Sequence, residues 1–442
     1  MRKLLTLLAC FLAFLESSFS QQLDDLLSTE AKKRNAIILK QIDSMHKVLP
    51  ALKREELVDG LLTLSNKFLF LPLSKQAKAD STNKYLSLAL TVSKKIGYKK
   101  GMGLAYSKLS GIEIQKNDTY WDNNKNPDDN KIAEFLNAAE VLLRKAIEIG
   151  ERTNNNMILG GSYWILAGVV ERRVWNDTSS ISWQKMMNEK ERVLRKAIYY
   201  TEKQGSELTE GSYRDIGFLT CAGCNGNERW LGGLYRDVAV LLSQKRDYKN
   251  AIELNKKSIS YYKKGGEKAL EGYMHNAQAN IYRMSGDISA EEESYKSAIA
   301  LFSENTNPEW ENNACIGLVA LYLARGEFEK SFPYCERSLK IMEALDKSGE
   351  KGTTNRRGSL YWMGRLYKVA GDYETALQYM RQAWPYYAGN KISVTNWKSE
   401  IGDLFTEMGN YDSAMYYLGP AIDPKTTIPH LANVTSVRFI SP

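Results

Sequence analysis

Proline and histidine are scarce in this chain, and each shortage excludes something. Ten prolines among 442 residues suit long helices with short turns, because proline removes an amide donor and breaks helix interiors. Three histidines, His46, His275 and His430, leave little room for a catalytic triad or a histidine-rich metal centre. No glycine pair has the spacing of a phosphate-binding or dinucleotide-binding loop. The sequence therefore favours a non-catalytic protein that needs no cofactor.

Cysteine is nearly as scarce, with five in the whole chain. Cys221 and Cys224 have redox or metal spacing, but a zinc site needs four ligands and no second pair of cysteines or histidines accompanies them. A disulfide between these two cysteines and two free thiols both stay open, and export would favour the disulfide. Cys315 and Cys335 fall at core-facing positions, where buried cysteines act as small hydrophobic residues. We therefore expect no metal centre.

Long hydrophobic runs are missing outside the first twenty residues. There, two basic residues precede an apolar run from Leu4 to Leu15, and Ser18 and Ser20 supply small residues before a cleavage point. This layout is typical of a secretory signal peptide. A lipid anchor on Cys10 is disfavoured because the apolar run before it is short. We expect an exported chain, in the periplasm, at the cell surface or secreted, with no membrane span in its mature part.

Charge of one sign is not concentrated anywhere. The 60 basic and 52 acidic residues give a formal charge of +8, but they are interspersed along the sequence. A nucleic-acid surface needs a basic stripe. The sequence therefore predicts solvated helix faces and no nucleic-acid partner.

The second half of the chain repeats two short helical patterns around a turn. Each turn residue has a small residue, or Val319 in one unit, eight positions before it. An aromatic residue or leucine lies five positions before it, and a small residue lies eleven positions after it. The turn residues are Asp247, Asp287, Glu327, Asp372 and Asn410. Small side chains let two antiparallel helices approach closely, and one such pair cannot bury its apolar face alone. The pattern predicts an all-α solenoid of stacked antiparallel helix pairs.

These units resemble tetratricopeptide repeats, whose pattern places Leu-Gly, Tyr, Ala, Phe and Ala at fixed offsets. The resemblance is clearest in YWMGRLYKVAGDYETALQYMRQAW, residues 361–384. The chain departs from the family in its longer period of about 40 residues and in Glu291 and Ser331, which replace the second-helix alanine. The acidic run Glu291–Glu293 is otherwise expected on a solvated helix face. The resemblance implies a right-handed superhelix whose first helices line a peptide-binding groove.

The repeat pattern divides the chain into five parts. These are a signal peptide (1–20), a degenerate helical or capping region (21–83), degenerate repeats with loop inserts (84–227), five clear repeats (228–422) and a C-terminal tail (423–442). Whether the tail is natural or truncated stays open. The polar or turn-rich inserts at 117–130, 175–183 and 217–230 are expected to project from one edge of the stack.

The register of the resemblance selects candidate groove residues. Asn276 and Asn280 resemble asparagines that hold a peptide backbone or a terminal carboxylate in some members of the family. Arg365 and Lys368 suit an acidic ligand. The full set is Arg236, Asn276, Asn280, Arg283, Tyr361, Arg365 and Lys368.

The preferred function is a non-catalytic scaffold or adaptor that binds a protein or peptide. One alternative is the sensor part of a split or truncated signal-transduction regulator, which would also contain a membrane helix and a kinase or helix-turn-helix domain. Another is an outer-membrane glycan-binding protein, in which Trp121 and Trp183 would stack on sugars. The oligomeric state stays open.

Overall fold

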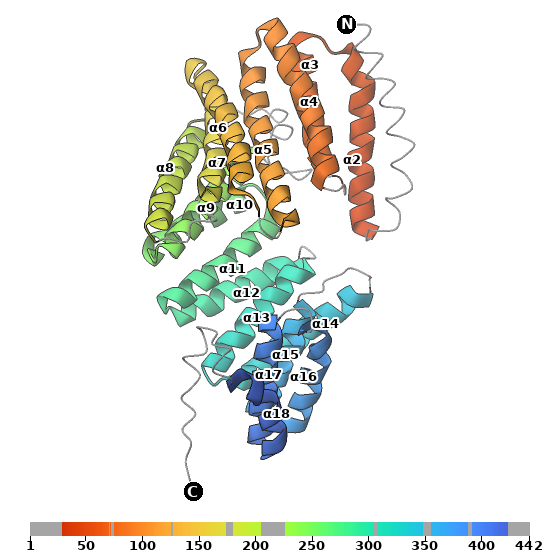
Figure 1. Ribbon diagram of the computed structural model, residues 1–442, viewed down its shortest axis with the longest axis vertical. Coiled ribbons are helices and arrows are strands. Elements are labelled where there is room, and N and C mark those ends of the chain that lie inside the picture. The colour runs from red at the N-terminus through yellow and green to blue at the C-terminus, as the bar shows by residue number, and fades with distance from the viewer. Residues whose placement is uncertain are drawn as a thin grey trace. The chain divides into compact units, whose positions relative to one another are not determined.

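The computed structural model describes most of the chain between residues 29 and 422. The described ranges are 29–69, 71, 75–124, 127–173, 180–204, 226–304, 307–347, 355–387 and 391–422. The predicted signal peptide, the Cys221–Cys224 pair and the tail from residue 423 lie outside them. Within these ranges the secondary structure is entirely helical (Figure 1).

The described residues form two compact units that divide between Glu291 and Glu292. The helices of the N-terminal unit are α2 (Thr29–Val48), η1 (Leu49–Ala51), α3 (Arg54–Leu69), α4 (Lys75–Ile96), α5 (Lys99–Asn123), α6 (Asp129–Arg152), α7 (Asn156–Arg172), α8 (Ser180–Gln204), α9 (Gly226–Gln244), α10 (Tyr248–Lys264) and α11 (Lys268–Ser285). The unit boundary falls inside α12 (Ile288–Glu304). The C-terminal unit continues with α13 (Pro308–Ala324), α14 (Phe328–Lys347), α15 (Asn355–Val369), α16 (Tyr373–Tyr387), α17 (Lys391–Glu407) and α18 (Tyr411–Ile422).

Consecutive helices pack as hairpins in both units. The pairs are α3/α4, α5/α6, α7/α8 and α9/α10 in the N-terminal unit, and α13/α14, α15/α16 and α17/α18 in the C-terminal unit. The second helix of each pair also contacts the first helix of the next, and α5/α7 and α13/α15 show that successive first helices touch directly. In each unit, we call the surface formed by these first helices the first-helix face of that unit. The predicted all-α solenoid of helix pairs is confirmed.

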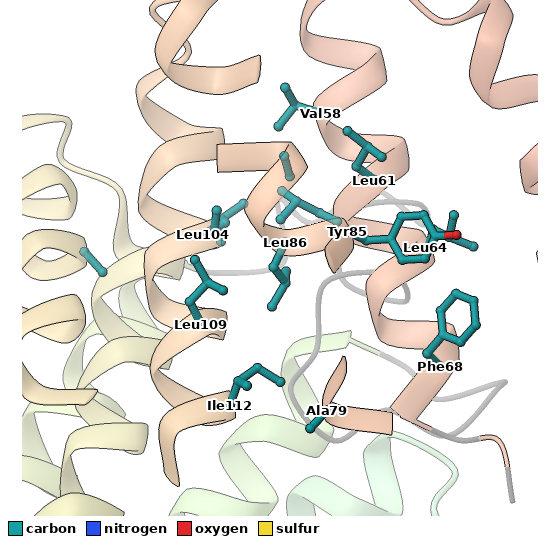
Figure 2. Close-up of a cluster of buried hydrophobic side chains, with 14 of the residues drawn as sticks. Val58, Leu61, Leu64, Phe68, Ala79, Tyr85, Leu86, Leu104, Leu109 and Ile112 are labelled. Carbon is teal, nitrogen blue, oxygen red and sulfur yellow. The ribbon is translucent and has the colours of Figure 1, made fainter. Parts of the chain in front are cut away.

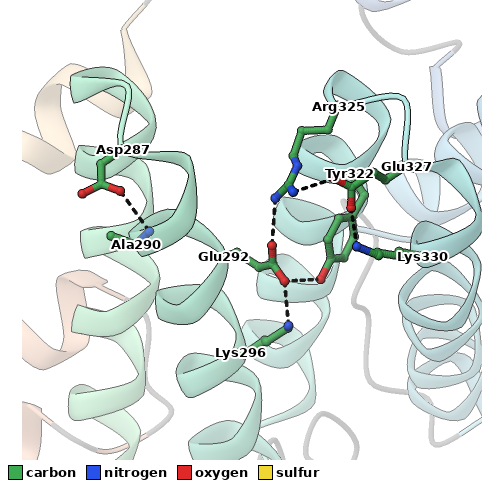
Figure 3. Close-up of polar contacts among 8 residues, drawn as sticks. All are labelled: Asp287, Ala290, Glu292, Lys296, Tyr322, Arg325, Glu327 and Lys330. Atoms are coloured by element: carbon green, nitrogen blue, oxygen red, sulfur yellow. Dashed lines mark hydrogen bonds and ion pairs between the residues drawn. The ribbon is translucent and has the colours of Figure 1, made fainter.

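The turns are built as their sequences predict. Gly286, Gly326, Gly371 and Gly409 end helices with φ between 72° and 84°, the left-handed region that glycine occupies without steric cost. After Gly371, the Asp372 carboxylate caps the following helix by accepting a hydrogen bond from the Thr375 amide (3.1 Å). Asp287 caps α12 in the same way through Ala290 (3.1 Å; Figure 3).

Much of the first core cluster of the N-terminal unit lies between α3, α4 and α5. Figure 2 shows Leu61 and Leu64 of α3 beside Tyr85 and Leu86 of α4, with Leu104 of α5 nearby. All five side chains are buried. Residue 84, the predicted start of the degenerate repeats, lies inside α4, and α3 and α4 already form a pair of the same kind.

The insert expected at 117–130 is largely wrong. Helix α5 continues to Asn123 and α6 starts at Asp129. Tyr120 and Trp121 pack against a buried cluster that includes Leu136 and Val169, and this packing outweighs the polar composition of the segment.

A polar network joins three helices of the C-terminal unit (Figure 3). The Glu292 carboxylate on α12 accepts hydrogen bonds from Lys296 (2.7 Å), from the Tyr322 hydroxyl (2.8 Å) and from Arg325 (2.9 Å). The bond from Lys296, more than the opposing effect of burial, lowers the pKa of Glu292. Exposed ion pairs contribute little singly, but this connected set fixes α12 against α13.

Gly364 marks the closest approach of α15 and α16. A Cβ atom there would lie 2.7 Å from Met380 Cγ and 3.2 Å from the Ala376 carbonyl oxygen. The backbone oxygen cannot move aside as a flexible side chain can. The two helices therefore require glycine at this position.

Replacing Gly364 with Leu should destabilise the α15/α16 pair by about 2–3 kcal/mol, because overpacking forces the helices apart. Urea unfolding followed by circular dichroism measures the loss. Gly168→Ala is the matched control, since an added Cβ there meets only the end of the Arg172 side chain, 3.2 Å away. The control should be neutral or slightly stabilising. Equal stability of Gly364→Leu and the wild type would contradict the packing argument.

Candidate functional site

The seven candidate residues all lie on first helices, but they fall into two groups. Arg236 is on α9, and Asn276, Asn280 and Arg283 are on α11, in the N-terminal unit. The other group, on α15 in the C-terminal unit, consists of Tyr361, Arg365 and Lys368. Each group is therefore considered by itself.

Arg236 is held by a network that links α7 to α9. Its Nε and Nη2 atoms donate to Asp237 Oδ1 at 2.9 and 2.8 Å. The other carboxylate oxygen of Asp237 accepts a hydrogen bond from the Trp164 indole (2.8 Å). Burial is the largest single influence and lowers the pKa of Arg236, but Asp237, Tyr262 and Tyr273 together outweigh it, so the pKa is raised. Arg236 thus acts first as a structural group.

The two asparagines of α11 are one turn apart, as the sequence predicted, but they are not equivalent. The Asn280 amide donates to the Asn276 carbonyl oxygen (3.2 Å), and Asn280 Oδ1 accepts from Arg283. Asn276 Oδ1 is buried and has no hydrogen-bond partner among the described residues. An unpaired buried acceptor costs about 1–3 kcal/mol. Asn276 therefore carries unused hydrogen-bonding capacity.

Arg283 also approaches a buried carboxylate. Its Nε atom lies 3.6 Å from Glu291 Oε1, and Glu291 is only 2% exposed. The solvated face expected for Glu291–Glu293 is wrong at Glu291, because that residue occupies the second-helix position where the repeat normally packs a small side chain. Burial raises the pKa of Glu291, and Arg283 opposes this only in part.

The C-terminal group contacts acidic residues of α17. The Tyr361 hydroxyl donates to Glu400 Oε1 (2.8 Å), and Lys368 Nζ lies 4.0 Å from Asp403 Oδ2. Burial raises the pKa of Asp403, with Lys368 opposing and Glu400 adding to the rise. The Arg365 guanidinium carbon lies 5.7 Å from the centre of the Tyr361 ring and 5.0 Å from that of Trp362.

Sequence reasoning missed the acidic partners on α17. Glu400, Asp403 and Glu407 are spaced three and four residues apart, which places them on one side of a helix. That spacing was visible in the sequence. The sequence did not show that these residues face α15.

The two tryptophans named for glycan stacking differ in the structure. Trp121 packs against the buried cluster around Leu136. Trp183 is 44% exposed. Only Trp183 therefore presents a substantial aromatic surface to a ligand.

Two buried thiols occupy the core of the C-terminal unit. Cys315 and Cys335 are both fully buried, as the sequence predicted, and burial raises the pKa of each to about 12. A thiol with such a pKa is almost entirely protonated at neutral pH and is a poor nucleophile.

The described residues contain few other features that could form a site. No group of three or more acidic, histidine or cysteine side chains there could hold a metal ion. In the same ranges no helix is both long and apolar enough to cross a membrane. A surface hollow at the α17–α18 turn is lined by residues 408–412 and contains none of the candidates.

Comparison with known proteins identifies the fold. No family model matches the chain, and no curated protein matches it in sequence. Among solved structures, the signal-transduction ATPase with a tetratricopeptide-repeat sensor from Pyrococcus horikoshii matches with a TM-score of 0.54 and 13% identity, over 90% of this chain and 53% of that one. The chain thus spans about half the length of that protein. The apo form of RapI matches with a TM-score of 0.50 and 14% identity, over 89% and 96% of the two chains.

These likenesses show the fold and no more. The chain is a solenoid of the tetratricopeptide-repeat type, and the predicted resemblance is confirmed.

Replacing Glu291 with Gln should stabilise the protein at pH 7.5 and do little at pH 4. A carboxyl whose folded pKa lies above its unfolded pKa binds more protons in the folded state, so stability falls as pH rises through that interval. Glutamine carries no charge, so the variant does not lose folding stability as the pH rises. We expect the melting temperature to rise by about 2–4 °C at pH 7.5.

Thermal unfolding at both pH values makes this measurement. Glu293→Gln on the exposed side of the same helix is the control and should change little. A gain for Glu291→Gln that is the same at pH 4 and pH 7.5 would show that the carboxylate charge is not the cause.

Proposed function

We propose that the chain is a non-catalytic scaffold that binds a protein or peptide along the first-helix faces of its two units. The observation that carries this proposal is the buried, unpaired Oδ1 atom of Asn276 on α11. A backbone amide of an extended peptide is the kind of donor that would satisfy it. The partner is therefore a peptide segment rather than a nucleic acid.

Asn255 on α10 shares the buried, unpaired Oδ1 atom, but its amide nitrogen is already engaged. Asn255 on the second helix α10 donates to the Met274 carbonyl oxygen (3.0 Å) and to Gln278 (3.1 Å), so its amide nitrogen already serves the packing of α10 against α11. On α11 the Asn280 amide donates to the Asn276 carbonyl oxygen, and Asn280 Oδ1 accepts from Arg283.

The non-catalytic part of the proposal is supported by the thiols. Cys315 and Cys335, with pKa values of about 12, are held protonated by the core. The glycan alternative loses support because Trp121 is committed to packing.

We also propose that the chain is exported, on the strength of the basic start, the apolar run to Leu15 and the small residues Ser18 and Ser20. Mass spectrometry of the protein recovered from the producing cells should find Gln21 as the first residue. Recovery of the full chain with its leader from the cytosolic fraction would contradict export.

Panning a random peptide library displayed on phage against the mature chain tests the binding function. Selected peptides should then be cross-linked through the photoreactive residue benzoylphenylalanine, placed at Tyr273 on α11 or Lys368 on α15. We expect cross-links from both positions, because both lie on first helices.

Lys256 on α10 and Arg381 on α16 are the matched second-helix positions, and both are exposed. The same photoreactive residue there should give no cross-link. Cross-links from these two positions alone, or a library that yields no binding peptide, would overturn the proposed function.

A further inference from the structure

Arg365 differs from every other half-buried arginine of the described chain. Four of these five arginines are paired with a carboxylate. The pairs are Arg172 with Asp118 (2.7 Å), Arg229 with Glu267 (3.0 Å), Arg236 with Asp237 (2.8 Å) and Arg337 with Glu311 (2.6 Å). Arg365 makes no hydrogen bond or ion pair with any described residue.

The pairing of the other four follows from a physical rule. Taking a charge partly out of water costs free energy, and a carboxylate partner offsets that cost. Arginines 54, 246 and 381 have no carboxylate partner among the described residues. All three are exposed, so water solvates their charges. Arg365 is the one described arginine that has lost part of its hydration without gaining a carboxylate.

Two aromatic rings fix the position of the Arg365 guanidinium. Its carbon lies 5.7 Å from the Tyr361 ring centre and 5.0 Å from the Trp362 ring centre. The Tyr361 ring is itself held by the hydrogen bond to Glu400 (2.8 Å). Contact with ring faces stabilises the cation but leaves its five N–H donors available. The guanidinium is thus oriented in advance for a planar acceptor.

The nearby carboxylates of α17 are engaged elsewhere. Glu400 accepts from Tyr361, and Asp403 Oδ2 lies 4.0 Å from Lys368 Nζ. The candidate residues on α15 are therefore not equivalent, because Tyr361 and Lys368 have partners on α17 and Arg365 does not.

We propose that Arg365 anchors the carboxylate of an Asp or Glu side chain in the bound peptide. The proposal rests on the function proposed above and names the chemistry that its ligand must carry. A carboxylate meets the fork of a guanidinium through two parallel hydrogen bonds, which are stronger and more directional than those to an ammonium group. Arg365 thereby sets a preference for acidic peptides in the C-terminal unit.

Parallel panning of the random peptide library on three proteins tests this assignment. The proteins are the wild type, Arg365→Gln and Arg381→Gln, which removes the same charge from an exposed position on α16. Peptides selected on the wild type and on Arg381→Gln should be enriched in Asp and Glu. The enrichment should disappear on Arg365→Gln.

Binding of one selected peptide, synthesised with an amidated C-terminus, then measures the contact. Its Kd should rise about tenfold on Arg365→Gln and stay within about twofold on Arg381→Gln. Replacing the acidic residue of the peptide with Gln should cost the same on the wild type and nothing further on Arg365→Gln. Arg365→Lys should recover part of the affinity, because it restores charge without the fork. Thermal unfolding of each variant confirms that folding is intact.

Three outcomes would overturn the assignment. They are binding peptides with no acidic enrichment, an equal loss on Arg381→Gln, and dependence on Arg365 only when the peptide has a free terminal carboxylate. In each of these the chain still binds peptides, so the scaffold function stands. A library that yields no binding peptide on any of the three proteins would remove both proposals together.

Discussion

The close approach of two antiparallel helices at small side chains is the constraint on which the structure depends. At Gly364 an added Cβ atom would lie 2.7 Å from Met380 Cγ and 3.2 Å from the Ala376 carbonyl oxygen on α16. The same condition holds at Gly232, where a Cβ atom would lie 2.8 Å from the Tyr262 ring. The aromatic residues one turn away, such as the stacked pair Tyr367 and Tyr379 with ring centres 5.6 Å apart, then fill the remaining space. A helix pair of this shape exposes apolar surface on its flanks, so neighbouring pairs must stack.

Most of this fold could be predicted from sequence because it is locally encoded. The turn glycines, the capping acids and the small positions recur at fixed offsets, and the structure uses them in the predicted way. The errors have a common cause. The last turns of α5 looked like a loop from their polar composition, but Tyr120 and Trp121 pack against a buried cluster that includes residues of α6 and α7. Glu291 looked solvated by its charge, yet its position in the repeat buries it.

The candidate site was predicted less completely, because its contacts are not local. The register placed all seven candidates on first helices. It could not show that Arg236 is bound by a network reaching Trp164, 73 residues from Asp237. Nor could it show that Lys368 faces Asp403 while Arg365 is left with aromatic rings alone. Which candidate is available to a ligand depends on partners that only the folded chain brings together.

On the proposed function, packing and binding are divided between residues that alternate along the same helices. The small and aromatic positions hold the pairs together, and the polar positions of the first helices remain for a partner. Hydrogen–deuterium exchange of the mature chain, with and without a bound peptide, tests this division most directly. The account predicts added protection at first-helix segments such as α11 or α15, with the outer segments of α10 and α16 unchanged. Protection confined to second helices would contradict it.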